Sequence, residues 1–197
     1  MDLRKESMVY RKHLNQISHK ELKRAYLLLC ELLESVHKSE MSRTASEDAV
    51  YNLIKQSTKL QVFRSFWIGK RNIDLFIPAI RANLNSGFTS SQGFKGLAIE
   101  IDGKIHDRYF KMKKDENKYE MLKELSICTV TIENHDINNP IVINMIQNLA
   151  KIKKVDSRAK SRLLRNIYLK TITCNKSLIV EHKLPTSTCI LRLLGEL

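Results

Sequence analysis

Three acidic residues stand inside apolar, strand-like segments of the chain. Asp74 lies within the apolar run 73–77, and Glu100 and Asp102 lie two positions apart in the run that ends at Gly103. Side chains two positions apart on a strand point to the same face of a sheet, so Glu100 and Asp102 would share one face. Carboxylates that are buried together need a counter-ion. If the two runs form neighbouring strands, the three carboxylates can meet.

A cluster of carboxylates suits Mg²⁺ or Mn²⁺, which are hard cations that keep part of their water shell and can hold a phosphate oxygen. Such an ion polarises a phosphoryl group and acidifies a bound water, which is the chemistry of phosphodiester hydrolysis. His106 follows the second acidic run, where an imidazole could move a proton near neutral pH. Each residue taken singly has a simpler explanation, because a strand carboxylate can pair with Lys or Arg and a lone histidine is more often structural.

The elements that would position this cluster follow from capping patterns and apolar periodicity. Ser18 and Thr44 each precede a Glu by three residues, so helices are expected to begin near residues 18 and 44. Periodicity predicts strands over 62–68, 72–77, 96–101 and 127–132, and helices over 115–125, 141–152, 158–172, 176–182 and 186–197. The segment 79–95 has no clear period and is predicted as a long loop. From residue 44 to 152 the expected order is α-β-β-β-α-β-α, an α/β fold.

The charge balance favours a polyanionic partner. The 197 residues include 34 Lys and Arg against 21 Asp and Glu, which gives a net charge of +13. Nucleic acid is the favoured partner and an anionic membrane surface the next. No run approaches the roughly 18 apolar residues of a membrane span, and the first residues lack an apolar signal region, so a cytoplasmic location is expected. The four cysteines are widely separated, which argues against a zinc site.

One combination of motifs is more specific than its parts. The chain carries, in order, Asp74, the run Glu100-Ile101-Asp102-Gly103 with His106, the helix start Asp115-Glu116-Asn117-Lys118, and the tail Glu133-Asn134-His135-Asp136-Ile137. With these motifs, the segment from Thr44 to about Ile152 resembles the Vsr-like (very-short-patch-repair-like) endonuclease domains of the PD-(D/E)XK superfamily. The resemblance implies a restriction-endonuclease-like core of order α-β-β-β-α-β, in which a mixed sheet is flanked by helices.

The resemblance also implies roles for single residues. Asp74 and Glu100 would be the metal ligands, and His106 would be an active-site acid or base. Glu47 would approach the site from the first helix of the core, although as the third residue of a capping box it could equally do nothing but cap. Asp102 stands where the superfamily usually has a Lys, and Lys104 lies close by.

Further departures concern packing and phosphate contact. The usual Arg of the D-x-x-R helix is Lys118 here, the usual Gly before the fourth strand is Ser126, and the usual Arg on that strand is Thr131. A related RNA-binding domain type shares the E-x-D-G-x-x-H-like strand. Binding without cleavage is therefore an alternative that the sequence leaves open.

Beyond residue 152 the chain becomes strongly basic. The residues expected to contact phosphate are Lys104, Lys118, Arg158, Lys160, Arg162, Arg165, Thr188 and Arg192. The segment 176–197 resembles the helix-turn-helix of IclR-type winged helices, and a basic helical cap packed on the core is the alternative with equal weight. Since all predicted strands precede residue 152, the sequence predicts that the core folds without the basic segment.

The sequence therefore predicts three parts: an N-terminal helical arm (1–43), a nuclease-like core (44–152) and a basic helical segment (153–197). The expected function is a Mg²⁺-dependent (or Mn²⁺-dependent) DNA endonuclease acting on duplex DNA. The alternatives are an inactive nuclease fold that binds nucleic acid or regulates, and an RNA-processing nuclease. The target, the setting (mobile element, restriction, repair or phage) and the pairing with a second copy or another protein stay open.

Overall fold

The computed structural model describes residues 17–38, 44–80, 95–102, 117–152 and 155–185. Its elements are α2 (His19–Val36), α3 (Ala45–Ser57), β1 (Phe63–Ile68), β2 (Arg71–Pro78), β3 (Gly96–Asp102), β4 (Ile127–Glu133), η1 (Asn134–Asp136), α5 (Pro140–Ala150), α6 (Ser157–Cys174) and α7 (Lys176–Glu181). A further helix, described over 117–124, precedes β4. Each expected strand lies within one residue of the strand in the structure.

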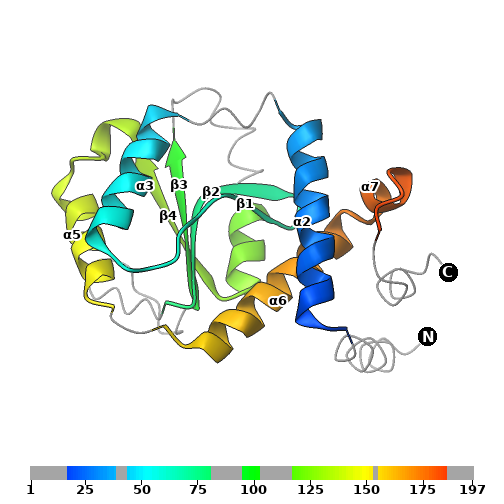
Figure 1. Ribbon diagram of the computed structural model, residues 1–197. Helices are drawn as coiled ribbons and strands as arrows, with labels where there is room; N and C mark the ends of the chain where they lie inside the picture. The colour runs from blue at the N-terminus through cyan, green and yellow to red at the C-terminus, as the bar shows by residue number, and fades with distance from the viewer. Residues whose placement is uncertain (1–16, 39–43, 81–94, 103–116, 153–154, 186–197) are drawn as a thin grey trace.

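The strands form one mixed sheet in the order β1-β2-β3-β4. β1 pairs with β2 and β2 with β3 in antiparallel fashion, whereas β3 and β4 are parallel. A parallel pair needs a crossover connection, and the helix 117–124 lies in the crossover from β3 to β4. The expected α/β fold is confirmed, and the sheet is enclosed by helices (Figure 1).

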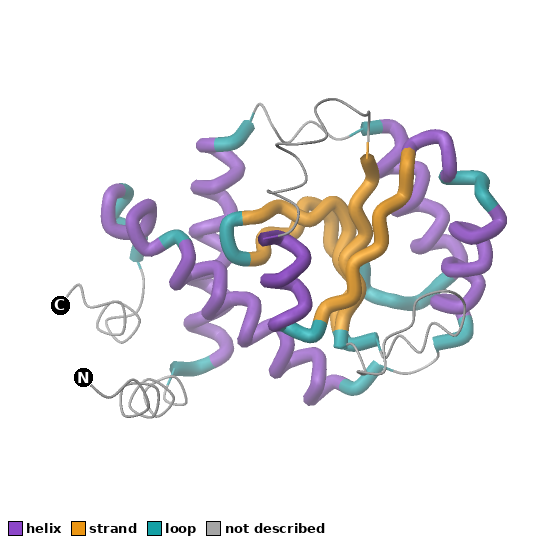
Figure 2. Tube along the Cα trace, turned by 180° about the vertical axis from the view of Figure 1, so that it is seen from behind, coloured by secondary structure: helices purple, strands orange, loops and turns teal. Residues whose placement is uncertain are grey.

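Two hydrophobic clusters lie against the sheet. The α3 cluster joins α3 and α5 to apolar residues of β2, β3 and β4, among them Leu75 and Ile99. The α6 cluster joins α2, α6, α7 and the helix 117–124 to the β1–β2 hairpin, and it includes Phe76 and Ala98. Figure 1 shows α3 and α5 on one side of the molecule and α2 and α6 on the other, and Figure 2 shows the sheet from behind.

The two N-terminal helices begin where their capping boxes predict. The Ser18 hydroxyl accepts a hydrogen bond from the Glu21 backbone N–H at 3.2 Å, and the Glu21 carboxylate accepts one from the Ser18 N–H at 3.0 Å. Thr44 and Glu47 form the same pair of bonds at the start of α3. Each box satisfies backbone donors that a helix start leaves without intrahelical partners, so the sequence fixes both start points.

The basic helix α6 is part of the protein core. Its side chains Leu163, Ile167 and Ile172 are buried in the α6 cluster together with residues of α2 and β1. Polar bonds fix its last turn as well, since the Gly69 N–H donates to the buried Thr171 hydroxyl at 2.9 Å. The Asn175 side chain donates to the Gly69 carbonyl at 2.8 Å. Helices α2 and α6, which precede and follow the segment 44–152 in the sequence, therefore pack as one core with the sheet.

Neither a membrane helix nor a disulfide is found in the part of the chain that the structure describes. None of the described helices combines the length and the apolar character that crossing a bilayer requires. Cys30, Cys128 and Cys174 are free thiols.

Candidate functional site

Asp74 and Glu100 lie next to each other where β2 and β3 stop pairing. The last backbone pair of this ladder is Leu75 with Ile99, and Asp74 and Glu100 are the next residues on each strand. Phe76 and Ala98 are partners in the same ladder and belong to the α6 cluster. Since side chains alternate along a strand, Asp74 and Glu100 face the same side of the sheet as these two residues. Two of the three expected carboxylates are thus brought together.

The Asp74 carboxylate contacts β3 directly. Its Oδ2 atom accepts a hydrogen bond of 2.7 Å from the backbone N–H of Ile101. This N–H belongs to the stretch of β3 that has lost its backbone partner on β2. The carboxylate therefore acts as the acceptor that a strand carbonyl would otherwise provide, which keeps a buried amide satisfied.

The Glu100 carboxylate forms an ion pair with Lys118 of the helix 117–124. The Lys118 Nζ atom lies 2.6 Å from Glu100 Oε2, and the two side chains are 14% and 17% exposed. A pair this well shielded from water has a stronger mutual attraction than a surface pair, but both groups lose hydration. Removing either partner alone would leave a largely buried charge, so the two residues depend on each other.

A second polar contact docks the same helix beside the first. The Tyr119 hydroxyl and the Thr131 hydroxyl share a hydrogen bond of 3.1 Å. Thr131 of β4 is the register partner of Glu100 on β3. Consecutive helix residues, Lys118 and Tyr119, thus contact neighbouring positions on the two parallel strands.

The turn that leads from this helix into β4 carries a conformation that favours glycine. Ser126 has a φ of 58°, in the left-handed region that glycine adopts most easily. The Vsr-like domains that the sequence resembles usually have Gly at this position. Its carbonyl accepts a bond of 2.7 Å from the Lys95 N–H, and its own N–H donates to the Lys123 carbonyl at 2.9 Å. The first bond joins the residue before β3 to the residue before β4, and the second closes the turn.

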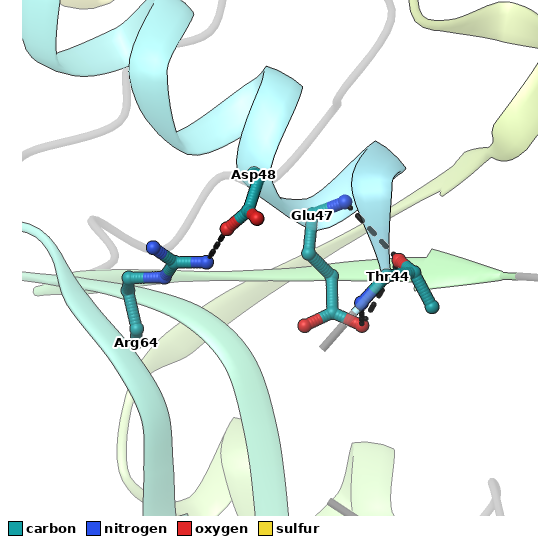
Figure 3. Close-up of polar contacts among 4 residues, drawn as sticks. All are labelled: Thr44, Glu47, Asp48 and Arg64. Carbon is teal, nitrogen blue, oxygen red and sulfur yellow. Dashed lines mark hydrogen bonds and ion pairs between the residues drawn. The ribbon is translucent and has the colours of Figure 1, made fainter. Parts of the chain in front are cut away.

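Glu47 caps its own helix (Figure 3). Its Oε1 atom accepts bonds from the Thr44 N–H at 3.3 Å and from the Thr44 hydroxyl at 3.2 Å. The next residue, Asp48, forms an ion pair with Arg64 of β1. The Arg64 guanidinium also lies 4.5 Å from the centre of the Tyr51 ring. The contacts of Glu47 among the described residues are those of a cap, and its catalytic role stays a prediction.

Other expected site residues lie outside the described residues. This holds for Lys104, His106, Thr188 and Arg192 and for the side chain of Asp102. The backbone of Asp102 ends β3 and is the register partner of Glu133 on β4. The roles expected for these residues stay predictions.

A second group of titratable side chains follows β4. The His135 Nε2 atom lies 3.4 Å from Glu133 Oε2 and 3.8 Å from Asp136 Oδ2. The ligand atoms of these three residues lie within 4.8 Å of one another, and Glu133 and His135 are exposed. In the sequence this tail is part of the family resemblance, and the spacing of its side chains gives no separate signal of a site. Exposed groups of this kind are common without a metal ion.

Four of the residues expected to contact phosphate belong to α6, a helix that contains no acidic residue. Arg158 and Arg162 are exposed, whereas Lys160 donates a hydrogen bond to the Gln61 side chain near the start of β1. Arg165 is half-buried. The exposed residues Arg158 and Arg162 are four positions apart and share one face of the helix.

Lys118 is the residue whose placement sequence reasoning missed. Its spacing after Asp115 suggested a phosphate contact, but in the structure it is the partner of Glu100. The signal that could have indicated this pairing is the excess of carboxylates on the strands, which need a basic partner from a neighbouring element. Comparison of the chain with protein-family models, with curated proteins and with solved structures gives no match.

Proposed function

We propose that this protein is a Mg²⁺-dependent DNA endonuclease that hydrolyses phosphodiester bonds on a PD-(D/E)XK-like core. The observation that carries the proposal is the pair of carboxylates, Asp74 and Glu100, placed side by side where β2 and β3 part. Natural sequences rarely place two acidic side chains together in a shielded position unless positive charge is held there.

The residues present fit a divalent cation. Asp74 and Glu100 offer the hard oxygen ligands that Mg²⁺ and Mn²⁺ prefer. The ammonium of Lys118 beside Glu100 marks a place where positive charge is stabilised. When bound, the cation would supply Lewis-acid polarisation of a phosphodiester and a more acidic water.

The protein's own residues have separate tasks in this proposal. Asp74 is held in one orientation by the Ile101 N–H, so a ligand on it would be preorganised. His106 is the proposed proton-transfer residue, and Lys104 a proposed phosphate contact. Arg158 and Arg162 on α6 would hold the nucleic-acid backbone, in line with the net charge of +13.

A second candidate function is supported by the same contacts. Since an amide already binds one oxygen of Asp74 and an ammonium one oxygen of Glu100, both carboxylates have a partner within the chain itself. A nuclease fold that binds nucleic acid without cutting it would have the same arrangement.

One experiment separates the two candidates. Supercoiled plasmid DNA and a structured RNA are incubated with the protein in Mg²⁺ or in EDTA, and binding is measured in parallel by gel shift. The endonuclease proposal expects nicked or linear DNA in Mg²⁺ alone, and loss of cutting but not of binding in Asp74→Asn and Glu100→Gln. Glu120→Gln, an exposed change on the helix 117–124, is the matched control. Binding without Mg²⁺-dependent cutting would favour the second candidate, and cutting of RNA alone would change the substrate class.

A further inference from the structure

We propose that Lys118 is a built-in competitor for the cation at Glu100. In the metal-free protein its ammonium neutralises the carboxylate, and a divalent cation must displace it to bind. This inference rests on the proposed metal site and adds the residue that sets the affinity of that site. In this proposal the partner of Lys118 in the metal-free protein is Glu100, whereas the sequence suggested a phosphate contact.

The position of Lys118 is unusual among the lysines of its surroundings. Its side chain is 14% exposed and its Nζ atom lies 2.6 Å from Glu100 Oε2. On the same helix Lys123 is exposed, and the nearby pair of Lys170 with Glu124 is 3.1 Å long with side chains 38% and 66% exposed. A lysine ammonium is strongly hydrated, so it stays in a shielded place only where a charged partner compensates.

A divalent cation and this ammonium would compete for the same oxygens. Two positive charges within a few ångströms repel each other, and a shielded site screens that repulsion less than water does. The Glu100 carboxylate can therefore bind one of the two cations closely, but not both at once. Because the lysine side chain has four methylene groups, its ammonium can leave without a shift of the backbone.

The helix has an anchor that does not depend on the ion pair. Tyr119 holds it to Thr131 on β4 through a hydrogen bond of 3.1 Å. Leu122 and Met121 add apolar contacts with the α6 cluster. Displacement of the Lys118 ammonium would thus free the side chain while the helix stays docked. The freed ammonium would turn away from the cation toward solvent, where it would be available to the phosphate of a bound nucleic acid.

The first test uses the wild-type protein. Lysines are acetylated with a limiting amount of an N-hydroxysuccinimide ester at constant pH and ionic strength, with and without Mg²⁺, and the modified sites are quantified by mass spectrometry. Lys118 is expected to react slowly without Mg²⁺ and faster with it, whereas Lys123 reacts equally in both. A Lys118 rate that saturating Mg²⁺ leaves unchanged would overturn the proposal.

The second test measures Mg²⁺ affinity by calorimetry. Lys118→Met removes the competitor and is expected to bind Mg²⁺ about tenfold or more tightly, the scale on which a neighbouring charge changes the affinity of a carboxylate. Lys118→Arg keeps the charge and should bind Mg²⁺ no more tightly than the wild type does, and Lys123→Met is the control. Thermal unfolding in EDTA establishes that each variant is folded. Equal or weaker affinity in Lys118→Met would contradict competition.

The failure of this inference can be told from the failure of the proposed function. If Mg²⁺ binds the wild type but not Asp74→Asn, and neither the Lys118 labelling nor the Lys118→Met affinity responds, the metal site stands and the competition is refuted. If the wild-type protein binds no Mg²⁺ at all, the metal site and the competition are both refuted.

Discussion

The Asp74 carboxylate accepts a hydrogen bond of 2.7 Å from the backbone N–H of Ile101. The bond spans the place where the β2–β3 ladder has ended at Leu75 and Ile99. The side chain therefore continues the contact between the two strands after their backbones have parted. One carboxylate thus contributes both to the sheet and to the candidate site, and suitable substitutions can separate the two contributions.

Asp74→Ala should destabilise the protein more than Asp74→Asn. Alanine leaves the Ile101 N–H without its acceptor in a shielded place, which costs about 1–3 kcal/mol of unfolding free energy. Asparagine keeps an oxygen that can accept the same bond, so its unfolding midpoint in urea should lie closer to that of the wild type. Both variants lose the negative charge, and both should lose Mg²⁺-dependent cleavage.

The urea midpoint reports on the hydrogen bond to Ile101, and the cleavage assay reports on the proposed metal site. Equal urea midpoints for the alanine and asparagine variants would show that the Ile101 bond contributes little to stability. An Asp74→Asn protein that cuts DNA like the wild type would remove Asp74 from the proposed metal site, whatever its stability.

The helix α6 should be required for folding. Ile167 is fully buried, so Ile167→Ala is expected to cost about 2–5 kcal/mol in urea unfolding. Leu27 on α2 is 48% exposed, and Leu27→Ala is the matched control with a change of about 0.5 kcal/mol or less. A chain cut after Ile152 lacks the whole helix and would expose the α2 side of the core.

The packing of α6 thus predicts the opposite of the expectation from the sequence, in which the core folds without residues after 152. Cooperative urea unfolding of a 1–152 fragment, with dispersed amide signals in its NMR spectrum, would show that the sheet and its remaining helices suffice. An uncooperative transition is the result that the buried contacts of Leu163 and Ile167 predict.

The local elements of this protein could be predicted because each has a short-range signal. The capping boxes at Ser18 and Thr44 fix two helix starts, and alternating apolar residues give the four strands. These signals depend on neighbours within a few residues. The placement of Asp74 beside Glu100 needed only the further assumption that the second and third strands pair, which they do.

The contacts between distant segments carried no such signal. Lys118 pairs with Glu100 because the crossover helix docks in one register on β3 and β4, and periodicity does not encode that register. The packing of α6 also could not be predicted from the sequence. Its basic residues indicate an exposed, phosphate-binding side and say nothing of the opposite side. Its buried face, with Leu163, Ile167 and Ile172, is ordinary for an amphipathic helix, and the sequence does not say against what it packs.

Stability should fall at alkaline pH. Burial raises the pKa of the Cys30 thiol to about 12, and it also raises the pKa of the Tyr26 and Tyr168 hydroxyls. In the unfolded chain the thiol releases its proton near pH 8.5–9, so above that pH the unfolded state binds fewer protons than the folded state. The unfolding free energy should therefore be unaffected by Cys30 below about pH 8 and decrease from there toward pH 12.

The Cys30→Ala variant isolates the contribution of the thiol. Urea unfolding at pH 8, 9.5 and 10.5 should show that the unfolding free energy of this variant declines less steeply than that of the wild type, because the thiol is absent. Some decline should remain, because Tyr26 and Tyr168 still contribute. Parallel declines for the two proteins would mean that the Cys30 thiol titrates alike in the folded and unfolded chains.

Replacing the exposed arginines of α6 should weaken nucleic-acid binding through its electrostatic part. Arg158 and Arg162 lie on one face of a helix that has no acidic residue. Each phosphate contact contributes about 0.9 to the slope of log K against log salt on duplex DNA. If both residues contact phosphate, Arg158→Gln with Arg162→Gln should lower that slope by about 1.8, measured by fluorescence anisotropy over a range of salt concentrations.

The matched control removes the same charge elsewhere. Lys23 and Arg24 are exposed on α2, so Lys23→Gln with Arg24→Gln changes the net charge equally but leaves α6 intact. A general effect of net charge would weaken binding and lower the salt slope similarly in both double variants. A surface on α6 that contacts phosphate would lower the slope only in the Arg158 and Arg162 variant. Equal slopes in all three proteins would place the nucleic-acid contact away from α6.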